Sequence, residues 1–319
     1  MIKAGIIGGT GYTGGELIRL LLHHPHAELA FVTSASNVGK KVSDLHQDLL
    51  GEIDMEFIEN STDADVLFLA MPHKESKIWL EKNEVGDAVI IDLGNDFRVG
   101  DTYKGNAFVY GLPELNAAQI KGSKLIANPG CFATAIQLGI LPILQHQKIS
   151  EIYTTGITGA TGAGKSLSET THFSWRQNNI SAYKTLTHQH LGEIYFQLKE
   201  VSQSPFSVQF VPWRGDFARG IFVSSTFKTS LSLEELFQVY EKFYEGQAFT
   251  TVSRKEINLK QVVNTNRCLI NIEKEGDFVV VHSAIDNLLK GASGQAIHNM
   301  NIAFGFPENA GLKLKSIAF

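Results

Sequence analysis

A glycine-rich turn near the start of the chain constrains the fold more than any other feature. It follows the apolar stretch from Ala4 to Gly8, which predicts a buried strand, and precedes Glu16 to Leu22, whose apolar spacing predicts a helix. A strand, a glycine turn and a helix in this order present backbone N–H groups and the positive end of the helix dipole to a pyrophosphate. A tight turn without a ligand is the plain alternative. The turn therefore predicts a dinucleotide site at Gly8, Thr10, Gly11, Tyr12, Thr13 and Gly14.

Short apolar runs alternate with helical patterns through the first half of the chain. After the first strand, the expected strands are Leu29 to Thr33, Val66 to Met71, Ala88 to Leu93 and Lys124 to Ala127. This alternation is typical of an α/β fold with a doubly wound parallel sheet, in which helices cover both faces of the sheet.

The expected strands after Cys131 are longer and more amphipathic. They are Glu151 to Ile157, Ser207 to Val211, Arg219 to Phe227, Arg267 to Glu273 and Asp277 to Ala284. Such strands are typical of a sheet with one solvated face, so we expect a mixed or antiparallel sheet in a second domain. Helices are predicted for Ser232 to Tyr244 and for Asn287 to Phe306, and the second of these is expected to pack back on the first domain.

Length and charge exclude several classes of protein. The 319 residues are enough for two domains, or for one domain with a large insertion. A formal net charge of −5 provides no basic surface for nucleic acid or an anionic membrane. No apolar run approaches the roughly 18 residues of a membrane span, and the first residues have a strand pattern instead of a signal peptide. We expect a cytoplasmic protein that binds neither nucleic acid nor a membrane.

The residues after the second expected strand favour NADP over NAD. NAD-binding enzymes of this type usually place Asp or Glu there to bind the ribose 2′-hydroxyl, and this stretch has neither. Ser34 and Ser36 are suited to donate hydrogen bonds to a 2′-phosphate, while Lys40 and Lys41 supply positive charge. The alternative for the two lysines is a solvated surface loop.

Cys131 is the expected nucleophile. It follows an Asn128-Pro129-Gly130 turn and precedes Ala135 to Leu141, which predicts a buried helix. At a helix N-terminus the dipole and the N–H groups stabilise a thiolate, and the same donors can bind the oxyanion that forms when the thiolate attacks a carbonyl. Cys268 lies in an expected strand and is interpreted as a core residue. Two cysteines are too few for a disulfide framework.

The glycine turn and the Asn-Pro-Gly-Cys segment together resemble those of the N-acetyl-γ-glutamyl-phosphate reductase family, arginine-pathway relatives of aspartate-semialdehyde dehydrogenase. The resemblance covers nearly the whole chain. Further matching segments are Ala70 to His73, Asp92-Leu93, Asp96 to Arg98, Tyr110 to Leu115, Gly162 to Lys165, His188 to His190 with Glu193, Arg219-Gly220, and Asn287 to Ala296.

The resemblance implies a Rossmann-type domain followed by an α+β catalytic and dimerisation domain. The expected boundaries are residues 1–128 for the NADP-binding domain, 129–286 for the catalytic domain, and 287–319 for a C-terminal helix and tail. It also implies NADPH-dependent reduction of an N-acyl-γ-glutamyl phosphate to the N-acyl-glutamate 5-semialdehyde, through a thioester on Cys131. A homo-oligomer, either a dimer or a tetramer, is expected, and no metal is expected in the site.

Two histidines are the candidates for proton transfer. A thioester route needs a group that takes up and releases protons near neutral pH, for which histidine is suited. The resemblance places His188, His190 and Glu193 at the active site, with His190 as general acid/base and His188 as a substrate contact or its substitute. A metal-binding pair is one alternative, although no third ligand is obvious, and a polar helix start is another.

The substrate that the resemblance implies carries a phosphate and a carboxylate, which require cations and polar donors. We expect Arg98, Lys165 and Arg219 to bind these anionic groups. Asn128, Tyr183 and Glu193 are further expected substrate contacts. Asn287 and Gln295 are expected to reach the nicotinamide amide.

The segment Gly159 to Ser166 matches the P-loop pattern and follows an expected strand, so ATP binding is a rival function. Against it, no downstream apolar strand ends in a metal-binding Asp, and the N-terminal turn already supplies a nucleotide site. The same N–H groups and Lys165 are better suited to the phosphate of an acyl phosphate.

Two departures from the family pattern leave the acyl group of the substrate open: Trp213 stands where many relatives have His, and Gly192 replaces a frequent Pro. Phe132-Ala133 also replaces a commoner aromatic-Pro pair, which is expected to loosen the turn without removing the nucleophile. N-acetyl is favoured, and N-succinyl, with Arg214 as its carboxylate partner, is the alternative. An aspartate-semialdehyde or aminoadipate-type reductase and a non-enzymatic NADP-binding sensor are the other hypotheses.

Overall fold

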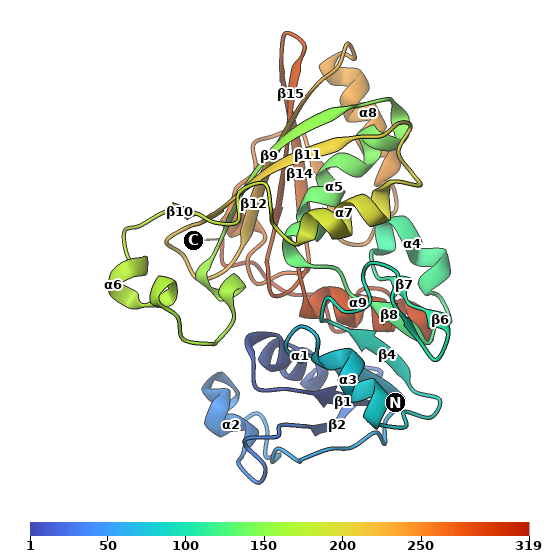
Figure 1. Ribbon diagram of the computed structural model, residues 1–319, viewed down its shortest axis with the longest axis vertical. Helices are drawn as coiled ribbons and strands as arrows, with labels where there is room; N and C mark the ends of the chain where they lie inside the picture. The colour runs from blue at the N-terminus through green and yellow to red at the C-terminus, as the bar shows by residue number, and fades with distance from the viewer. Residues whose placement is uncertain (319) are drawn as a thin grey trace. The chain divides into compact units, whose positions relative to one another are not determined.

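The computed structural model describes residues 1–318, which form two compact units. The first unit comprises Met1–Pro129 and Ala292–Lys313, and the second comprises Gly130–Gly291 with residues 314–318. Figure 1 shows the elements of both units along the chain. Over residues 1–318, every helix is too short or too polar to cross a membrane.

The first unit contains a six-stranded parallel sheet with the strand order β2-β1-β3-β4-β8-β7. Every residue of β3 and β4 is buried, as expected for parallel strands with helices on both faces. The sheet confirms the Rossmann-type prediction. Its strands are β1 (Ile2–Ile7), β2 (Ala27–Val32), β3 (Val66–Leu69), β4 (Val89–Asp92), β7 (Val109–Tyr110) and β8 (Leu125–Ala127).

Helices from both ends of the chain complete the first unit. The last of them, α9, packs against α1, α4 and β4, although the segment Gly130–Gly291 of the second unit separates β8 from α9 in sequence. A small hairpin of β5 (Thr102–Tyr103) and β6 (Asn106–Ala107) lies outside the sheet. The helices are α1 (Tyr12–Leu22), α2 (Val42–Leu45), η1 (Gln47–Leu49), α3 (Glu75–Lys82), α4 (Pro113–Ile120) and α9 (Ser293–Phe304).

The second unit is built on a seven-stranded sheet with the strand order β10-β11-β9-β12-β15-β14-β13. The pairs β11–β9 and β13–β14 are parallel and the other pairs are antiparallel, so the predicted mixed sheet is confirmed. The strands are β9 (Glu151–Thr158), β10 (Ser181–Ala182), β11 (Ser207–Arg214), β12 (Ile221–Lys228), β13 (Thr250–Ser253), β14 (Cys268–Glu275) and β15 (Phe278–Ile285).

Helices cover one side of this second sheet (Figure 1). The central one, α5 (Cys131–His146), packs against β12 and β15 and is buried from Phe132 to Leu144. Its companions are α7 (His190–Leu198) and α8 (Leu233–Phe243). The remaining short helices are η2 (Ala160–Ala163), η3 (Glu169–Thr171), α6 (Phe173–Arg176) and η4 (Leu259–Gln261).

A proline in the middle of α5 leaves one backbone carbonyl without its helical hydrogen bond, and a tyrosine at the C-terminal end of α8 replaces that bond. Pro142 has no N–H, so the carbonyl of Leu138 one turn earlier loses its helical partner. The hydroxyl of Tyr244 donates to this carbonyl at 2.5 Å, and Tyr240 donates to the carbonyl of Gly139 at 2.8 Å. These two hydrogen bonds hold the middle of the buried helix that begins at Cys131.

The expectation for the closing segment needs one correction. Helix was predicted from Asn287 to Phe306, but α9 begins only at Ser293, and turns occupy the residues before it. The backbone of Ala292 lies outside the helical region, with φ −157° and ψ −96°. The turns follow from Asp286, whose carboxylate accepts hydrogen bonds from the backbone N–H groups of Leu288 and Leu289 and so competes with helix formation.

Candidate active site

The turn after β1 is held from two sides. Gly8 has φ +81°, a backbone conformation that residues with a side chain rarely adopt. Its N–H donates to Oγ1 of Thr33 at 3.1 Å, and the N–H of Gly9 donates to the Thr33 carbonyl at 3.0 Å. On the other side, Nε2 of His46 donates to the Gly9 carbonyl at 2.8 Å. Sequence reasoning missed Thr33 and His46 because neither belongs to the glycine pattern.

The glycines of this turn leave room for a ligand at the start of α1. A Cβ on Gly14 would lie 2.5 Å from the carbonyl carbon and oxygen of Gly9, so α1 can begin against the turn only with glycine there. A Cβ on Gly11 would have no atom of the described chain within 4 Å. Gly11 is the N-cap of α1 and has no side-chain cap, so the first N–H groups of this helix lack helical partners and its dipole is positive here. This cradle fits the pyrophosphate of a nicotinamide dinucleotide.

Three of the residues expected at the ribose end of the cofactor lie around one asparagine. The Asn37 amide donates to the hydroxyls of Ser34 and Ser36 at 3.2 and 3.0 Å, and Nζ of Lys40 donates to its Oδ1 at 3.1 Å. The group therefore offers hydroxyls and one ammonium. Lys41 instead forms an ion pair with Asp54 at 2.8 Å, which neutralises the charge expected from it.

Cys131 is the first residue of α5, and its side chain is partly exposed. Gly130 precedes it as the N-cap, and the N–H of Thr134 donates to the Gly130 carbonyl at 2.8 Å. The N–H groups of the first turn, at Phe132 and Ala133, have no earlier helical carbonyl to bond to. A thiolate and an oxyanion are therefore both stabilised at this end of α5.

Two residues hold the nucleophile in place: Glu193 binds the backbone just before Cys131, and Gly291 leaves space for the Cys131 side chain. Oε1 of Glu193, which is buried in the first turn of α7, accepts a hydrogen bond from the N–H of Gly130 at 2.8 Å. Glu193 therefore contacts the turn before the nucleophile. A Cβ on Gly291 would lie 2.8 Å from Cβ of Cys131 and 2.6 Å from the Asn287 carbonyl oxygen. Only glycine at 291 leaves the Cys131 side chain in place.

The two candidate histidines are adjacent and buried. Their rings lie 4.7 Å apart, and Nδ1 of His188 accepts a hydrogen bond from the backbone N–H of His190 at 3.3 Å. Burial, and after it the charge of Lys184, lowers the pKa of His188 to about 4, so this ring is neutral at pH 7. Through residues 1–318, no three His, Cys, Asp or Glu side chains gather in the way that a metal ion requires.

Aromatic rings connect the histidines with the start of α5. His188 contacts Phe132 edge-to-face at 5.7 Å and Tyr183 at 5.7 Å. Burial, and after it the charge of Cys131, raises the pKa of the Tyr183 phenol, while Arg214 acts in the opposite direction. The structure thus brings together Cys131, Tyr183, His188, His190 and Glu193.

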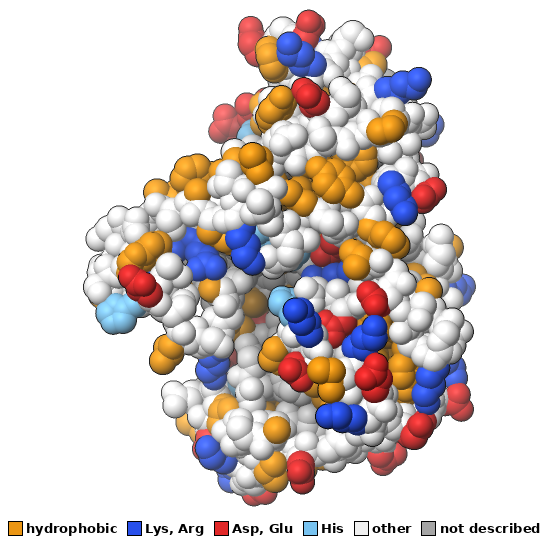
Figure 2. All heavy atoms as spheres, viewed as in Figure 1, with side chains coloured by type: hydrophobic (Ala, Val, Ile, Leu, Met, Phe, Trp, Pro, Cys, Tyr) orange, Lys and Arg blue, Asp and Glu red, His pale blue; other side chains and the backbone are white. Residues whose placement is uncertain are grey.

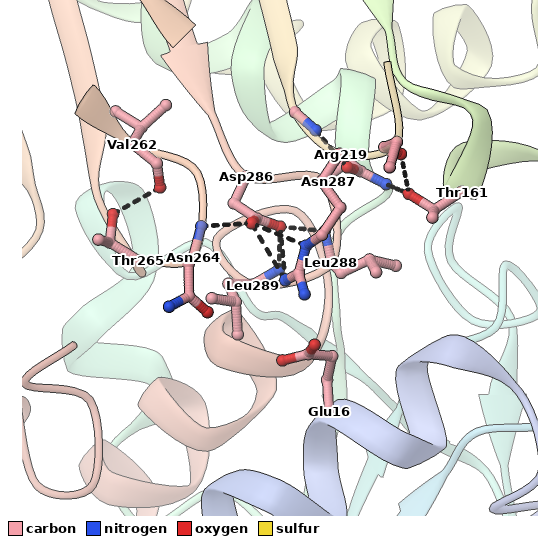
Figure 3. A network of polar contacts seen from close by, with 12 residues as sticks. Glu16, Thr161, Arg219, Val262, Asn264, Thr265, Asp286, Asn287, Leu288 and Leu289 are labelled. Atoms are coloured by element: carbon pink, nitrogen blue, oxygen red, sulfur yellow. Dashed lines mark hydrogen bonds and ion pairs between the residues drawn. The ribbon is translucent and has the colours of Figure 1, made fainter. Parts of the chain in front are cut away.

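Arg219 is bound to a buried carboxylate in the same unit (Figure 3). Its Nε and Nη2 both donate to the carboxylate of Asp286 at 3.1 Å, and Asp286 is fully buried. Beside it, Oδ1 of Asn287 accepts a hydrogen bond from the N–H of Gly220 at 2.7 Å, and its amide donates to Thr161 at 3.0 Å. The side chains of Arg219 and Asn287 thus hold the loops around β12 and β15.

Three further site candidates of the first unit, Arg98, Asn128 and Gln295, are buried apart from the glycine turn. The guanidinium of Arg98 donates to the carbonyls of Asn128 and Leu93 at 2.8 and 2.9 Å. The Asn128 amide donates to the Ala292 carbonyl at 3.0 Å, and Gln295, also fully buried, donates to the Gly111 carbonyl at 3.0 Å. These side chains join the end of β8 to the start of α9 and its surroundings.

The P-loop pattern does not have P-loop geometry. A P-loop lysine opens an α-helix, but Gly164, with φ +79°, follows the 3-10 turn η2 and Lys165 lies exposed in a bend. Between Lys165 and Ser168 the described chain has no helix. Lys165 is accessible to an anion, without the cradle that an ATP-binding loop would need.

Two family profiles match the chain. Residues 3–123 match the profile described as "Semialdehyde dehydrogenase, NAD binding domain", and residues 131–287 match "Semialdehyde dehydrogenase, dimerisation domain". Among curated proteins, the N-acetyl-gamma-glutamyl-phosphate reductases of Bacteroides fragilis and Flavobacterium johnsoniae are 50% and 51% identical to the chain. Each alignment covers 100% of both sequences.

Solved structures of similar fold have much lower sequence identity. Aspartate semialdehyde dehydrogenase II of Vibrio cholerae superposes with a TM-score of 0.74 at 16% identity, over 95% of this chain and 98% of that one. The aspartate semialdehyde dehydrogenase of Candida albicans, solved with NADP, has a TM-score of 0.71 at 17% identity over the same shares. These two likenesses show the fold.

Proposed function

Since this chain belongs to the family of N-acetyl-gamma-glutamyl-phosphate reductases, we propose that it reduces an N-acyl-γ-glutamyl phosphate to the 5-semialdehyde and phosphate. The acyl group named for the relatives is acetyl. The observation that carries the proposal is the position of Cys131 at the start of α5, beside two histidines and a tyrosine. The reaction belongs to the biosynthesis of arginine.

The first half-reaction is acyl transfer to Cys131. Its thiolate attacks the acyl carbon, the S–C bond forms, and the oxygen of the acyl carbon becomes an oxyanion near the N–H groups of Phe132 and Ala133. The bond from carbon to the phosphate oxygen then breaks, and phosphate leaves. Lys165 and Tyr183 are proposed to contact the leaving phosphate and the polar groups of the acyl part that stays on Cys131. Both residues belong to the unit that holds Cys131.

The second half-reaction converts the thioester into an aldehyde. When bound, the nicotinamide cofactor supplies a hydride. His190 donates a proton to the substrate oxygen and takes it back as the C–S bond breaks, which returns the Cys131 thiolate. His188, kept neutral by burial, accepts the backbone N–H of His190 and positions it.

NADPH is the proposed reductant. Ser34, Ser36 and Lys40 around Asn37 offer hydroxyl donors and a positive charge, and the residues from Phe31 to Lys41 include no carboxylate that would bind a ribose 2′-hydroxyl. Gly8 to Gly14 would hold the pyrophosphate. Cys131 must be a thiol for the reaction, which supports a cytoplasmic location.

A homodimer formed through the open face of the second sheet is also proposed. Trp213, Ile157 and Phe222 are cross-strand neighbours in one row of this face, and each is partly exposed. Figure 2 shows apolar side chains gathered over β9 and β11. The helices α5, α7 and α8 cover the other face, so a second copy is the partner that would bury this row.

Oxidation of NADPH measured with a panel of acyl phosphates tests the proposal. We expect turnover with N-acetyl-γ-glutamyl phosphate, release of phosphate, and a lower kcat/KM with NADH than with NADPH. Turnover of aspartyl phosphate in place of the N-acylated substrate would contradict the substrate assignment, and equal use of NADH would contradict the cofactor assignment.

A further inference from the structure

Arg214, the last residue of β11, is a partly buried cation that has no acidic partner in the described chain. Its guanidinium lies 4.6 Å over the ring of Tyr183, and its Nη1 donates to the hydroxyl of Thr170 at 3.1 Å. Asp216, two residues later, accepts a hydrogen bond from the backbone of Asn178 instead. The two contacts fix the orientation of the Arg214 fork without neutralising its charge.

The guanidinium of a second arginine, Arg176, contacts the backbone of Arg214. Arg176 is buried, and its Nη2 donates to the backbone carbonyls of Arg214 and Asn179, both at 2.9 Å. Its Nε and Nη1 are also buried and have no hydrogen-bond partner among residues 1–318. Figure 2 shows Lys and Arg side chains together on the surface near β10. Two cations without a carboxylate create a positive potential that favours an anion at this place.

Tyr183 places this charge beside the nucleophile. One face of its ring carries Arg214, the ring contacts His188 at 5.7 Å, and the charge of Cys131 acts on its hydroxyl. Tyr183 therefore contacts both Arg214 and the histidine that packs on Phe132, the residue next to the nucleophile. In a glutamyl group bound to Cys131, three carbon atoms separate the acyl carbon from the α-carboxylate, so this carboxylate lies near the same residues.

The other arginine expected at the anionic groups in this unit is already paired. Arg219 is held by both carboxylate oxygens of Asp286, and that pair is electrically neutral. Arg214 differs, because no carboxylate of the described chain pairs with it, and a guanidinium is suited to bind a carboxylate.

We propose that Arg214 binds a carboxylate of the substrate, with Tyr183 and Thr170 fixing its guanidinium and Arg176 adding positive charge. The inference rests on the proposed function. Two groups of the substrate have the required chemistry, namely the α-carboxylate of the glutamyl part and the terminal carboxylate of a dicarboxylic acyl group such as succinyl. Either one makes Arg214 a determinant of specificity.

Steady-state kinetics of Arg214→Met and Arg214→Lys test the proposal, with Arg254→Met as the control. Arg254 is an exposed arginine of the same unit that pairs with Glu234 and Glu241. We expect Arg214→Met to raise KM by roughly 10- to 100-fold, as for loss of a charged hydrogen bond, and to change kcat by less than about threefold. Arg214→Lys should recover part of the loss, and Arg254→Met should behave as the wild type.

The two substrates distinguish the two carboxylates. Equal losses with N-acetyl- and N-succinyl-γ-glutamyl phosphate assign Arg214 to the α-carboxylate, whereas a loss confined to the succinyl substrate assigns it to the acyl group. An unchanged KM for both would overturn the proposal. If the wild-type enzyme turns over neither substrate, the proposed function itself has failed.

Alkylation of Cys131 gives a readout that needs no turnover. Iodoacetate carries a carboxylate and iodoacetamide does not, so the ratio of their rates reports the positive charge near the thiolate. We expect the ratio to fall in Arg214→Met, to be retained in Arg214→Lys, and to be unchanged in Arg254→Met. The same ratio in wild type and Arg214→Met would contradict a carboxylate site at Arg214.

Discussion

At the scale of single residues, Glu193 supports the nucleophile through one hydrogen bond. Because its carboxylate accepts the buried N–H of Gly130, Glu193→Ala leaves that donor unsatisfied and should lower the free energy of unfolding by about 1–3 kcal/mol. Glu193→Gln keeps an acceptor oxygen and should lose less. Urea denaturation measures both, with Glu200→Ala at the exposed end of the same segment as the control. Equal losses for the Gln and Ala variants would show that the charge, not the hydrogen bond, matters.

His188 makes the stability of the fold dependent on pH. Its pKa is lowered to about 4 in the folded state from an ordinary value of 6.5, so the unfolded chain binds the proton more readily between these values. Its contribution is therefore fully present above about pH 6.5 and is lost as the pH falls towards 4, by about 2 kcal/mol between pH 7 and pH 5.

His188→Asn isolates this contribution, because the Asn oxygen can still accept the N–H of His190 without titrating. We expect the difference in unfolding free energy between pH 7 and pH 5 to be about 2 kcal/mol smaller in the variant. Identical pH profiles for the two proteins would argue against a neutral buried His188.

The residue types of the site were predictable from the sequence, but their partners were not. Cys131 stands out because it follows a Pro-Gly turn and precedes an apolar helix, whereas His190 was placed at the site by the family resemblance. The pairing of Arg219 with Asp286 joins positions 67 residues apart, and only the folded chain brings them together. Arg214, in contrast to Arg219, has no acidic partner in the described chain, and this too can be recognised only when its neighbours in the fold are known.

At the scale of elements, two glycines at the start of α1 have different roles: Gly14 is needed for packing, and Gly11 leaves space for the cofactor. Gly14→Ala puts a Cβ 2.5 Å from Gly9 and should disrupt the packing of α1 on β1, with a loss of thermal stability. Gly11→Ala meets nothing in the described chain, so it should leave the melting temperature nearly unchanged and weaken NADPH binding. Thermal melts and cofactor titration measure the two effects. Normal NADPH affinity in Gly11→Ala would place the pyrophosphate elsewhere.

The start of α5 gives a second pair of glycine variants. Gly291→Ala puts a Cβ 2.8 Å from Cβ of Cys131, so it should displace the thiol and slow its alkylation by iodoacetamide. Gly192 is an exposed position in the first turn of α7, where an added Cβ meets no described atom, so Gly192→Ala should stabilise the protein by roughly 0.5–1 kcal/mol. An unchanged alkylation rate in Gly291→Ala would mean that Cys131 is not confined by this residue.

Long periodic elements were predictable from the sequence and short ones were not. The strands β9, β12, β14 and β15 have eight residues each. Buried positions alternate with more exposed ones throughout β9 and β12, and over part of β14 and β15. The strands β7 and β10 have two residues each, too few for any period, and they form only because a neighbouring strand offers free backbone groups. The late start of the closing helix has the same kind of cause, since Asp286 accepts hydrogen bonds from the N–H groups that follow it.

At the scale of the whole molecule, the open sheet face predicts the assembly. Ile157→Glu puts a charge in the middle of the row formed with Trp213 and Phe222, and should dissociate the proposed dimer. Leu233→Glu, an exposed apolar residue at the start of α8, is the control and should leave the dimer intact. Light scattering after size-exclusion chromatography measures the mass. A dimeric Ile157→Glu variant would exclude this face as the interface.

The central claim is that Cys131 carries the acyl group between phosphate release and reduction. Rapid mixing of the enzyme with N-acetyl-γ-glutamyl phosphate in the absence of NADPH, followed by acid quench, measures released phosphate and the mass of the Cys131 peptide. The account predicts one phosphate per active site and an added N-acetylglutamyl group on Cys131, both absent in Cys131→Ser. Full turnover by Cys131→Ser, or an unmodified Cys131 peptide after phosphate has been released, would contradict it.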